Sequence, residues 1–193
     1  MKNAMDIIHD EHRALAAVLH SMRSVVDGID KGRYAADFRL LSAMVEYVTE
    51  VPERVHHPKE DDYLFARLRL RSPEAAALLD ELQAEHRRGA AEIAALEHAL
   101  IHYQTAGAEG FAAFRDAVNK YVADHFQHMS KEEGRVMPLA RQVLKDEDWA
   151  EIGTAFAANA SPWAGVAGEY EQLFSTIVNL APPPIGVGPE AKA

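Results

Sequence analysis

The sequence predicts an all-α protein, an antiparallel up-down four-helix bundle with short C-terminal helices and an extended tail. Ala, Leu, Glu and Arg dominate the composition, and all four favour helices. Apolar residues recur at three- and four-residue steps along four long stretches, the spacing that places them on one helix face. Stretches that alternate β-branched and polar residues are missing. Short connections between the four stretches favour antiparallel neighbours.

The apolar stripe of residues 3–26 predicts the first helix, which Gly28 should help to end. A second stripe begins near Tyr34 and runs on for almost 40 residues. Pro52 and Pro58 fall inside this second stripe. Each proline removes a backbone donor and crowds the carbonyl four residues earlier, so we expect a kink or a break there.

The third helix is expected over residues 73–103, with Ser72 as its N-cap and a proline at its first position. The glycine-containing turn around Gly107 should separate it from the fourth helix, over residues 111–133. A glycine and a proline then disturb the pattern, although it continues to Leu144.

The rest of the chain reads as an appendage to the bundle. Residues 146–158 and 165–180 have the pattern of two short helices, and the proline-rich end from residue 181 suits no regular element. We therefore divide the chain into a bundle over residues 1–145 and an appendage over residues 146–193, packed on or beside it.

Composition narrows the function. The 193 residues include 20 Lys and Arg against 30 Asp and Glu, giving a net charge of −10. Such an acidic chain repels phosphate backbones, which argues against nucleic-acid binding. No stretch has the length and apolarity of a membrane span or a signal peptide, so the expected location is the cytoplasm. Cysteine is absent, which excludes thiolate metal sites, whereas the ten histidines leave imidazole and carboxylate ligands available.

Several histidines fall on the apolar stripes rather than on the polar faces. His12 lies in the stripe of the first helix, with His9 at its edge, and His86 lies in the middle of the third stripe. In the fourth helix, His125 and His128 are three residues apart and share a face. Because a single inward histidine is usually a core residue with one hydrogen bond, the recurrence on every helix is what points to a common site.

Carboxylates accompany these histidines at helical spacing. Glu132 follows His128 by four residues and lies closer to the inward direction than Glu133. In the second helix His56 and Glu60 form an i, i+4 pair, while periodicity alone favours His57 as the more inward histidine. Burying unpaired carboxylates costs several kcal/mol, so cations are expected beside them.

The set is too large for one tetrahedral ion. Imidazole and carboxylate ligands without sulfur suit iron, manganese or zinc, and two ions fit the number of donors. A ferritin-like centre would need two Glu-x-x-His motifs, and the sequence offers one, from Glu53 to His56. The candidate ligands are His12, His56, Glu60, His86, His128 and Glu132.

The order of these motifs resembles the hemerythrin HHE cation-binding domain over about residues 5–145. The strings HHPKED and HMSKEE, which begin at His56 and His128, are similar to two signatures of that family. The resemblance implies an antiparallel four-helix bundle with two non-haem iron ions, bridged by Glu60 and Glu132 and by an oxo or hydroxo group. One histidine from the first helix and one from the third would complete the site.

The sequence departs from the oxygen carriers of that family. They carry a second histidine four residues from the ligand of the third helix, where this chain has Leu82 and Ala90. Their last carboxylate comes five residues after its histidine, which would select Glu133 here. The additional candidate ligands are therefore His57, His9, His125 and Glu133.

These observations leave three functions open. The first is a binding protein that holds dioxygen or nitric oxide for sensing, storage or scavenging, and it is favoured over an enzyme. The second is a di-iron oxidoreductase acting on peroxide or on iron, with Tyr63 and Tyr121 as possible helpers. The third is a structural module whose site is degenerate or filled by zinc. The sequence leaves the oligomeric state undetermined.

Overall fold

The computed structural model describes residues 3–158 and 166–189, and within those residues it contains helices and no strand. The predicted all-α class is confirmed. In the described part of the chain, no helix is both long enough and apolar enough to cross a membrane.

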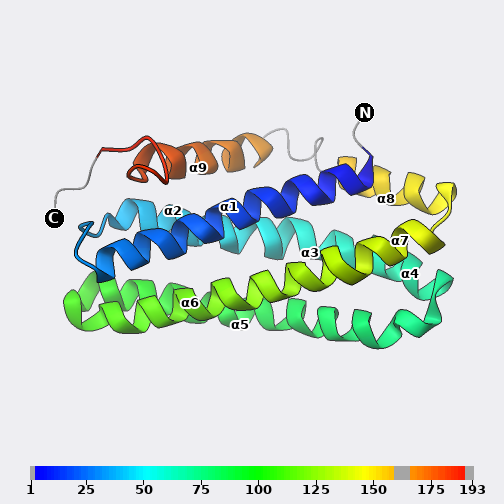
Figure 1. Ribbon diagram of the computed structural model, residues 1–193, viewed down its shortest axis with the longest axis horizontal. Coiled ribbons are helices and arrows are strands. Elements are labelled where there is room, and N and C mark those ends of the chain that lie inside the picture. Colours follow the sequence, from blue (N-terminus) through cyan, green and yellow to red (C-terminus); the bar gives the residue numbers. More distant parts are fainter. Residues whose placement is uncertain (1–2, 159–165, 190–193) are drawn as a thin grey trace.

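Four long helical segments lie lengthwise beside one another, and consecutive segments reverse direction along the chain (Figure 1). The first is α1 (Ala4–Asp30), and the third is α5 (Ala76–Ala106), which follows a 3-10 turn, η3 (Pro73–Ala75). α1 packs against α2 and α6, and α5 packs against the same two helices. Each long segment therefore has two neighbours, and all four face a shared interior.

The second segment contains two π-helical stretches near its prolines: Pro52 lies in the first stretch, and Pro58 lies in the α-helical turn between the two. It runs as α2 (Phe38–Glu50), η1 (Val51–His56), α3 (His57–Lys59), η2 (Glu60–Phe65) and α4 (Ala66–Arg71). The His57 N–H bonds the Pro52 carbonyl five residues back, as π geometry requires. The segment thus widens at the prolines and stays helical.

The fourth segment also contains a π-helical stretch next to a proline. It runs as α6 (Ala108–Lys131), η4 (Glu132–Val136) and α7 (Met137–Val143). The Met137 N–H bonds the Glu132 carbonyl across the π turn, directly before the proline at position 138. The pattern that the sequence extends to Leu144 is therefore helical throughout.

Two glycines behave differently from one another. α1 does not end at Gly28 but continues to Asp30, and the Tyr34 ring packs where a Cβ on residue 28 would lie, so the glycine serves this close packing rather than the end of the helix. Gly107 forms the expected turn between α5 and α6 with φ +64° and ψ −137°, a conformation that glycine tolerates best. Ser72 precedes η3 as predicted, but its hydroxyl donates to the Glu74 carboxylate rather than capping the helix backbone.

The C-terminal residues lie against the first two segments. α8 (Asp146–Ala158) packs beside α1, and α9 (Val166–Leu180) packs beside α2. Residues 181–189 form no helix or strand, as expected, but they turn back rather than extend, and the Val187 N–H bonds the Val178 carbonyl in α9. The final residues, 190–193, lie outside the described residues.

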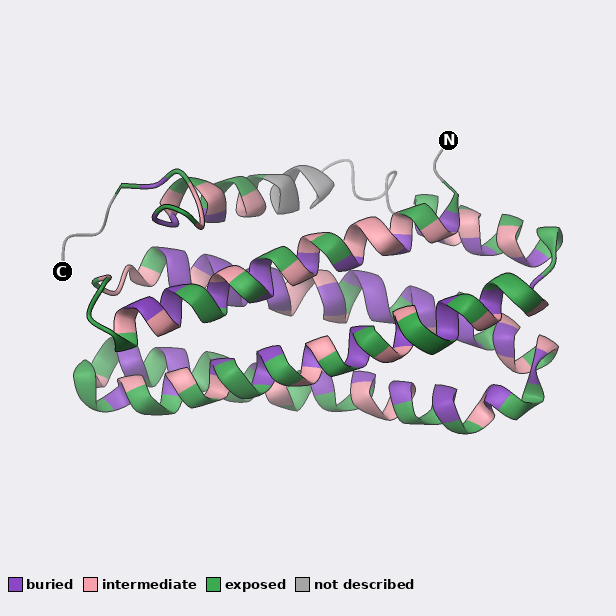
Figure 2. Cartoon of the chain, viewed as in Figure 1, coloured by how far each residue is buried: buried purple, intermediate pink, exposed green. Residues whose placement is uncertain are grey.

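Buried apolar residues form two separate clusters. One lies among α1, α2, α5 and α6 and includes Leu19, Met44, Leu96 and Phe114. The other brings α4, α7 and α8 against the start of α1, with Phe65 as a central member. Figure 2 shows buried positions along the inward faces of all four long segments.

Candidate metal centre

A layer of buried polar residues separates the two apolar clusters. Along α1, His12 lies between Ile8 of one cluster and Leu15 of the other, and along α5, His86 lies between Leu82 and Ile93. The second and fourth segments contribute to the same layer from their π-helical regions and from the α-helical turns next to them. The buried residues there are His56, His57, Lys59, Glu60, His125, His128 and Glu132.

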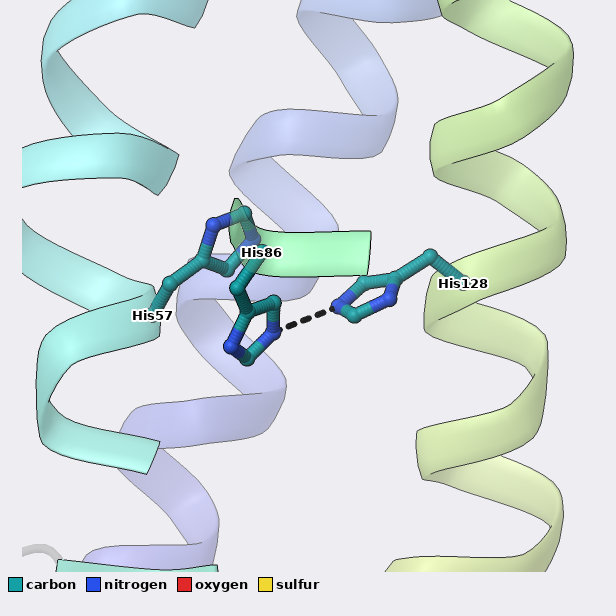
Figure 3. A group of neighbouring side chains, drawn as sticks. All are labelled: His57, His86 and His128. Atoms are coloured by element: carbon teal, nitrogen blue, oxygen red, sulfur yellow. Dashed lines mark hydrogen bonds between the residues drawn. The ribbon is translucent and has the colours of Figure 1, made fainter. Parts of the chain in front are cut away.

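Four of these histidines form two pairs. The Nε2 atoms of His12 and His56 are 2.8 Å apart. The Nε2 atoms of His86 and His128 are 3.0 Å apart, the contact that Figure 3 marks with a dashed line. Each pair joins two neighbouring segments, and each imidazole directs the same nitrogen inward.

Glu60 lies between the two pairs. Its Oε1 is 3.3 Å from the Nε2 of His56, and its Oε2 is 3.8 Å from the Nε2 of His86. Its side chain is 1% exposed, and neither oxygen has a hydrogen-bond partner.

Glu132 occupies the equivalent position from the fourth segment. Its Oε2 is 3.4 Å from the Nε2 of His12, and its Oε1 is 3.1 Å from the Nε2 of His128. Both of its buried oxygens also lack a hydrogen-bond partner. Each carboxylate thus presents one oxygen to each histidine pair.

A second layer of carboxylates holds the outer nitrogens of the four histidines. The Nδ1 atom of each ring lies 2.7 to 2.9 Å from a carboxylate oxygen on the adjacent segment. The four pairs, with the carboxylate first, are Glu11 with His56, Asp61 with His86, Glu85 with His128 and Glu133 with His12. These contacts close a ring around the bundle, and each fixes the tautomer that leaves Nε2 free to face inward.

The carboxylates determine the charge of the metal-free cluster. Burial by itself lowers the pKa of His12, but Glu132 and Glu133 outweigh burial and raise that pKa to about 10. Carboxylate partners likewise overcome burial at His86, whose pKa rises to about 10, and at His56, whose pKa rises to about 9. In the metal-free cluster the raised pKa values of His12, His56 and His86 favour their protonated forms at neutral pH, and a bound cation would displace those protons.

The donor set fits two metal ions. His12, His56, Glu60 and Glu132 form one group in which all ligand atoms lie within 4.8 Å, and Glu60, His86, His128 and Glu132 form a second. Two nitrogens bound to one ion at about 2.1 Å and at right angles lie about 3.0 Å apart, close to both observed pair distances. The two groups share their carboxylates, and the orienting ring is the support that metal-bound histidines need.

The family comparison agrees with this geometry. The model of the hemerythrin HHE cation-binding domain matches residues 3–140, which include all four long segments. The chain belongs to the hemerythrin HHE cation-binding domain family. Comparisons with curated proteins and with solved structures gave no match.

This HHE domain brings all six first-choice candidates into the shared site. Glu132 rather than Glu133 faces the interior, as its helical phase predicts, and the half-exposed Glu133 hydrogen-bonds His12 and His9 from outside. His9 is 30% exposed and belongs to none of the ligand groups of the described residues. His57 and His125 are buried in the HHE domain beside the second pair, outside the two groups that contain Glu60 and Glu132. His57 nevertheless forms a third group of candidate ligand atoms with the second histidine pair.

Sequence reasoning missed the orienting role of Glu11, Asp61 and Glu85. Each stands next to a predicted ligand in the sequence, a signal that could have been used. It also missed Lys59, which is buried, with its Nζ 3.0 Å from Glu11 and 4.6 Å from the Phe156 ring centre.

Proposed function

We propose that this HHE domain is a dinuclear non-haem iron protein that binds dioxygen or nitric oxide. The observation that carries the proposal is the set of four carboxylate oxygens of Glu60 and Glu132, buried without hydrogen-bond partners between two histidine pairs. Once the neighbouring histidines are deprotonated, these buried carboxylates cost several kcal/mol unless cations replace the lost protons, and two divalent cations would offset that cost.

Iron is the metal that the donors favour in this arrangement. Two imidazoles and two shared carboxylates give each ion nitrogen and oxygen ligands without sulfur, and four protein ligands leave positions open on an octahedral ion. When bound, ferrous ions would supply the electrons and the open positions through which diatomic gases are held. The protein residues orient the donors through the outer ring and exclude bulk water by burial.

A cavity of about 460 Å³ adjoins the first histidine pair. Its lining includes His12 together with Ala16, Phe126 and Met129. Apolar side chains beside a metal site favour the approach of a neutral diatomic molecule over that of a charged substrate.

The tyrosines considered as catalytic helpers lie in other surroundings. The Tyr121 hydroxyl donates to the Val48 carbonyl at 3.1 Å, and Tyr63 is exposed. These positions favour ligand binding over peroxide turnover as the role of the site.

The test combines metal analysis with gas titration. Protein from iron-replete cells should contain two iron ions per chain, and the reduced protein should change its absorbance on addition of dioxygen or nitric oxide. Glu60→Gln should reduce the iron content, whereas the matched control Glu97→Gln on the exposed face of α5 should leave it unchanged. Zinc in place of iron, or an iron-loaded protein whose spectrum ignores both gases, would refute the proposal. Repeated consumption of peroxide would favour the oxidoreductase instead.

A further inference from the structure

Three side chains beside the second histidine pair form a further cluster: the buried His57 and His125 and the partly buried Glu53, whose side chain is 17% exposed. His57 is shared between the two, because it also forms a group of candidate ligands with the histidine pair itself. Glu53, His57 and His125 each offer a ligand atom, and the three atoms lie within 4.8 Å of one another. His57 and His125 are more than nine-tenths buried. Glu53 Oε1, His57 Nδ1 and His125 Nε2 are all buried atoms without a hydrogen-bond partner.

The surrounding structure holds these donors in place. The His125 ring packs on the Tyr121 ring with centroids 4.0 Å apart and hydrogen-bonds the Tyr121 backbone, which leaves Nε2 as its free nitrogen. The His57 ring stacks on His86 at 4.0 Å, nearly parallel to it, as Figure 3 shows. Both imidazoles are thus oriented before any ligand arrives.

Glu53 reaches the cluster because α5 has a glycine opposite it. A Cβ on residue 89 would collide with both carboxylate oxygens of Glu53. Gly89 therefore makes the space that the carboxylate occupies, although glycine within a helix costs about 1 kcal/mol relative to alanine.

His57 does not follow the pattern of the four paired histidines. Their Nδ1 atoms lie 2.7 to 2.9 Å from an orienting carboxylate, whereas His57 Nδ1 is 3.5 Å from Glu53 Oε1 and makes no hydrogen bond. That spacing is too long for a carboxylate that orients a ring. It suits two atoms that share an ion.

We propose that Glu53, His57 and His125 form a third, mononuclear site for a divalent transition-metal ion. Two imidazoles and one carboxylate are a known donor set for zinc and for ferrous iron, with the remaining positions open. A cavity of about 270 Å³ is lined by all three residues. Glu92 and Asp124 also line it, but both of these carboxylates pair with Lys120, so the carboxylate available to an ion is that of Glu53. The inference goes beyond the dinuclear site and does not depend on its gas ligand.

The experiment counts ions in the full chain. Iron-loaded protein is dialysed against buffered free Zn²⁺, and bound zinc and iron are measured separately by mass spectrometry. The wild type should bind one additional zinc ion per chain, and Glu53→Gln and His125→Phe should lose it while their iron content is retained. The phenylalanine keeps a ring against Tyr121 but has no ligand nitrogen.

Two further variants separate this site from loss of structure and from surface binding. Gly89→Ala leaves all three donors in the chain but displaces the Glu53 carboxylate, so it should also lose the additional zinc. His98→Ala removes an exposed histidine from α5 and should retain it. Circular dichroism monitors the helical fold of each variant.

Two results would overturn the proposal. One is a wild type that binds no additional zinc, and the other is an additional zinc ion that persists in Glu53→Gln and His125→Phe. Loss of the proposed gas-binding function is seen separately, in the iron content and the response to dioxygen and nitric oxide.

Discussion

Replacing each of two adjacent carboxylates, Glu132 and Glu133, separates a bridging role from an orienting one. Glu132 is 1% exposed and presents one oxygen to each histidine pair. Glu133 is 37% exposed and hydrogen-bonds the outer nitrogen of His12 at 2.7 Å. Glu132→Gln should therefore remove a ligand from both ions, whereas Glu133→Gln should remove the support of one histidine.

The magnitudes follow from these contacts. Loss of an orienting partner typically lowers metal affinity 10- to 100-fold, or about 1.4–2.7 kcal/mol. At a saturating metal concentration the same free energy is lost from stability, which is about 3–11 °C in the melting temperature of a chain this long. Glu132→Gln should exceed that range, because one substitution weakens two ions.

The assay is the difference between melting temperatures with and without metal, measured by circular dichroism for each variant. Taking the difference removes any effect of a substitution on the metal-free fold. Glu133→Gln should retain part of the metal-induced rise and two ions per chain. The opposite result would be a Glu133→Gln variant without any metal-induced rise in melting temperature and a Glu132→Gln variant that keeps the rise. Glu133 would then be the bridging residue, and the assignment of Glu132 as the inward carboxylate would be wrong.

Three other perturbations test different parts of the structure. The folded-state pKa of His12 is raised to about 10. Its contribution to the stability of the metal-free protein is therefore complete below about pH 6.5 and is lost as the pH rises through about 10. The melting temperature of the metal-free protein should accordingly fall from pH 6 to pH 10. Lys59→Met removes the ion pair at Glu11 and should cost about 1–3 kcal/mol in urea unfolding, while a neutral result would show that the pair adds no stability. Gly107→Ala should cost about 1–3 kcal/mol by the same measurement, because alanine is strained at φ +64° and ψ −137°, and an unchanged midpoint would contradict the turn geometry.

Periodicity predicted the helices well and their ends less well. The stripes identified the long segments, because burying an apolar face is what stabilises a helix in a bundle. The end of α1 was misplaced because glycine is a weak stop signal, and the packing of the Tyr34 ring on Gly28, which accounts for a glycine inside the helix, is not visible in the sequence. Pro52 and Pro58 indicated a disturbance, but nothing in the local sequence specifies that π turns accommodate it.

The same π turns explain why the second segment was ambiguous. In a regular α-helix, His56 and His57 point 100° apart, so periodicity had to choose the more inward of the two. Both are buried, and they face different clusters: His56 pairs with His12, whereas His57 lies with Glu53. The orienting carboxylates escaped prediction for another reason, since they are partly exposed and resemble ordinary surface charges until the neighbouring helix is in place.

The two histidine pairs have equivalent donors and different surroundings. The lining of the cavity beside His12 includes the apolar Ala16, Phe126 and Met129, whereas the cavity beside His86 is lined almost entirely by charged and polar groups of both signs, Glu53 among them. A neutral molecule loses little beside the apolar side chains of the first cavity, and a cation in the second could bind the Glu53 carboxylate and the two histidines beside it. The fold thus gives one dinuclear centre two unlike approaches, and this asymmetry is why we assign the gas ligand to the His12 side and the additional ion to the His86 side.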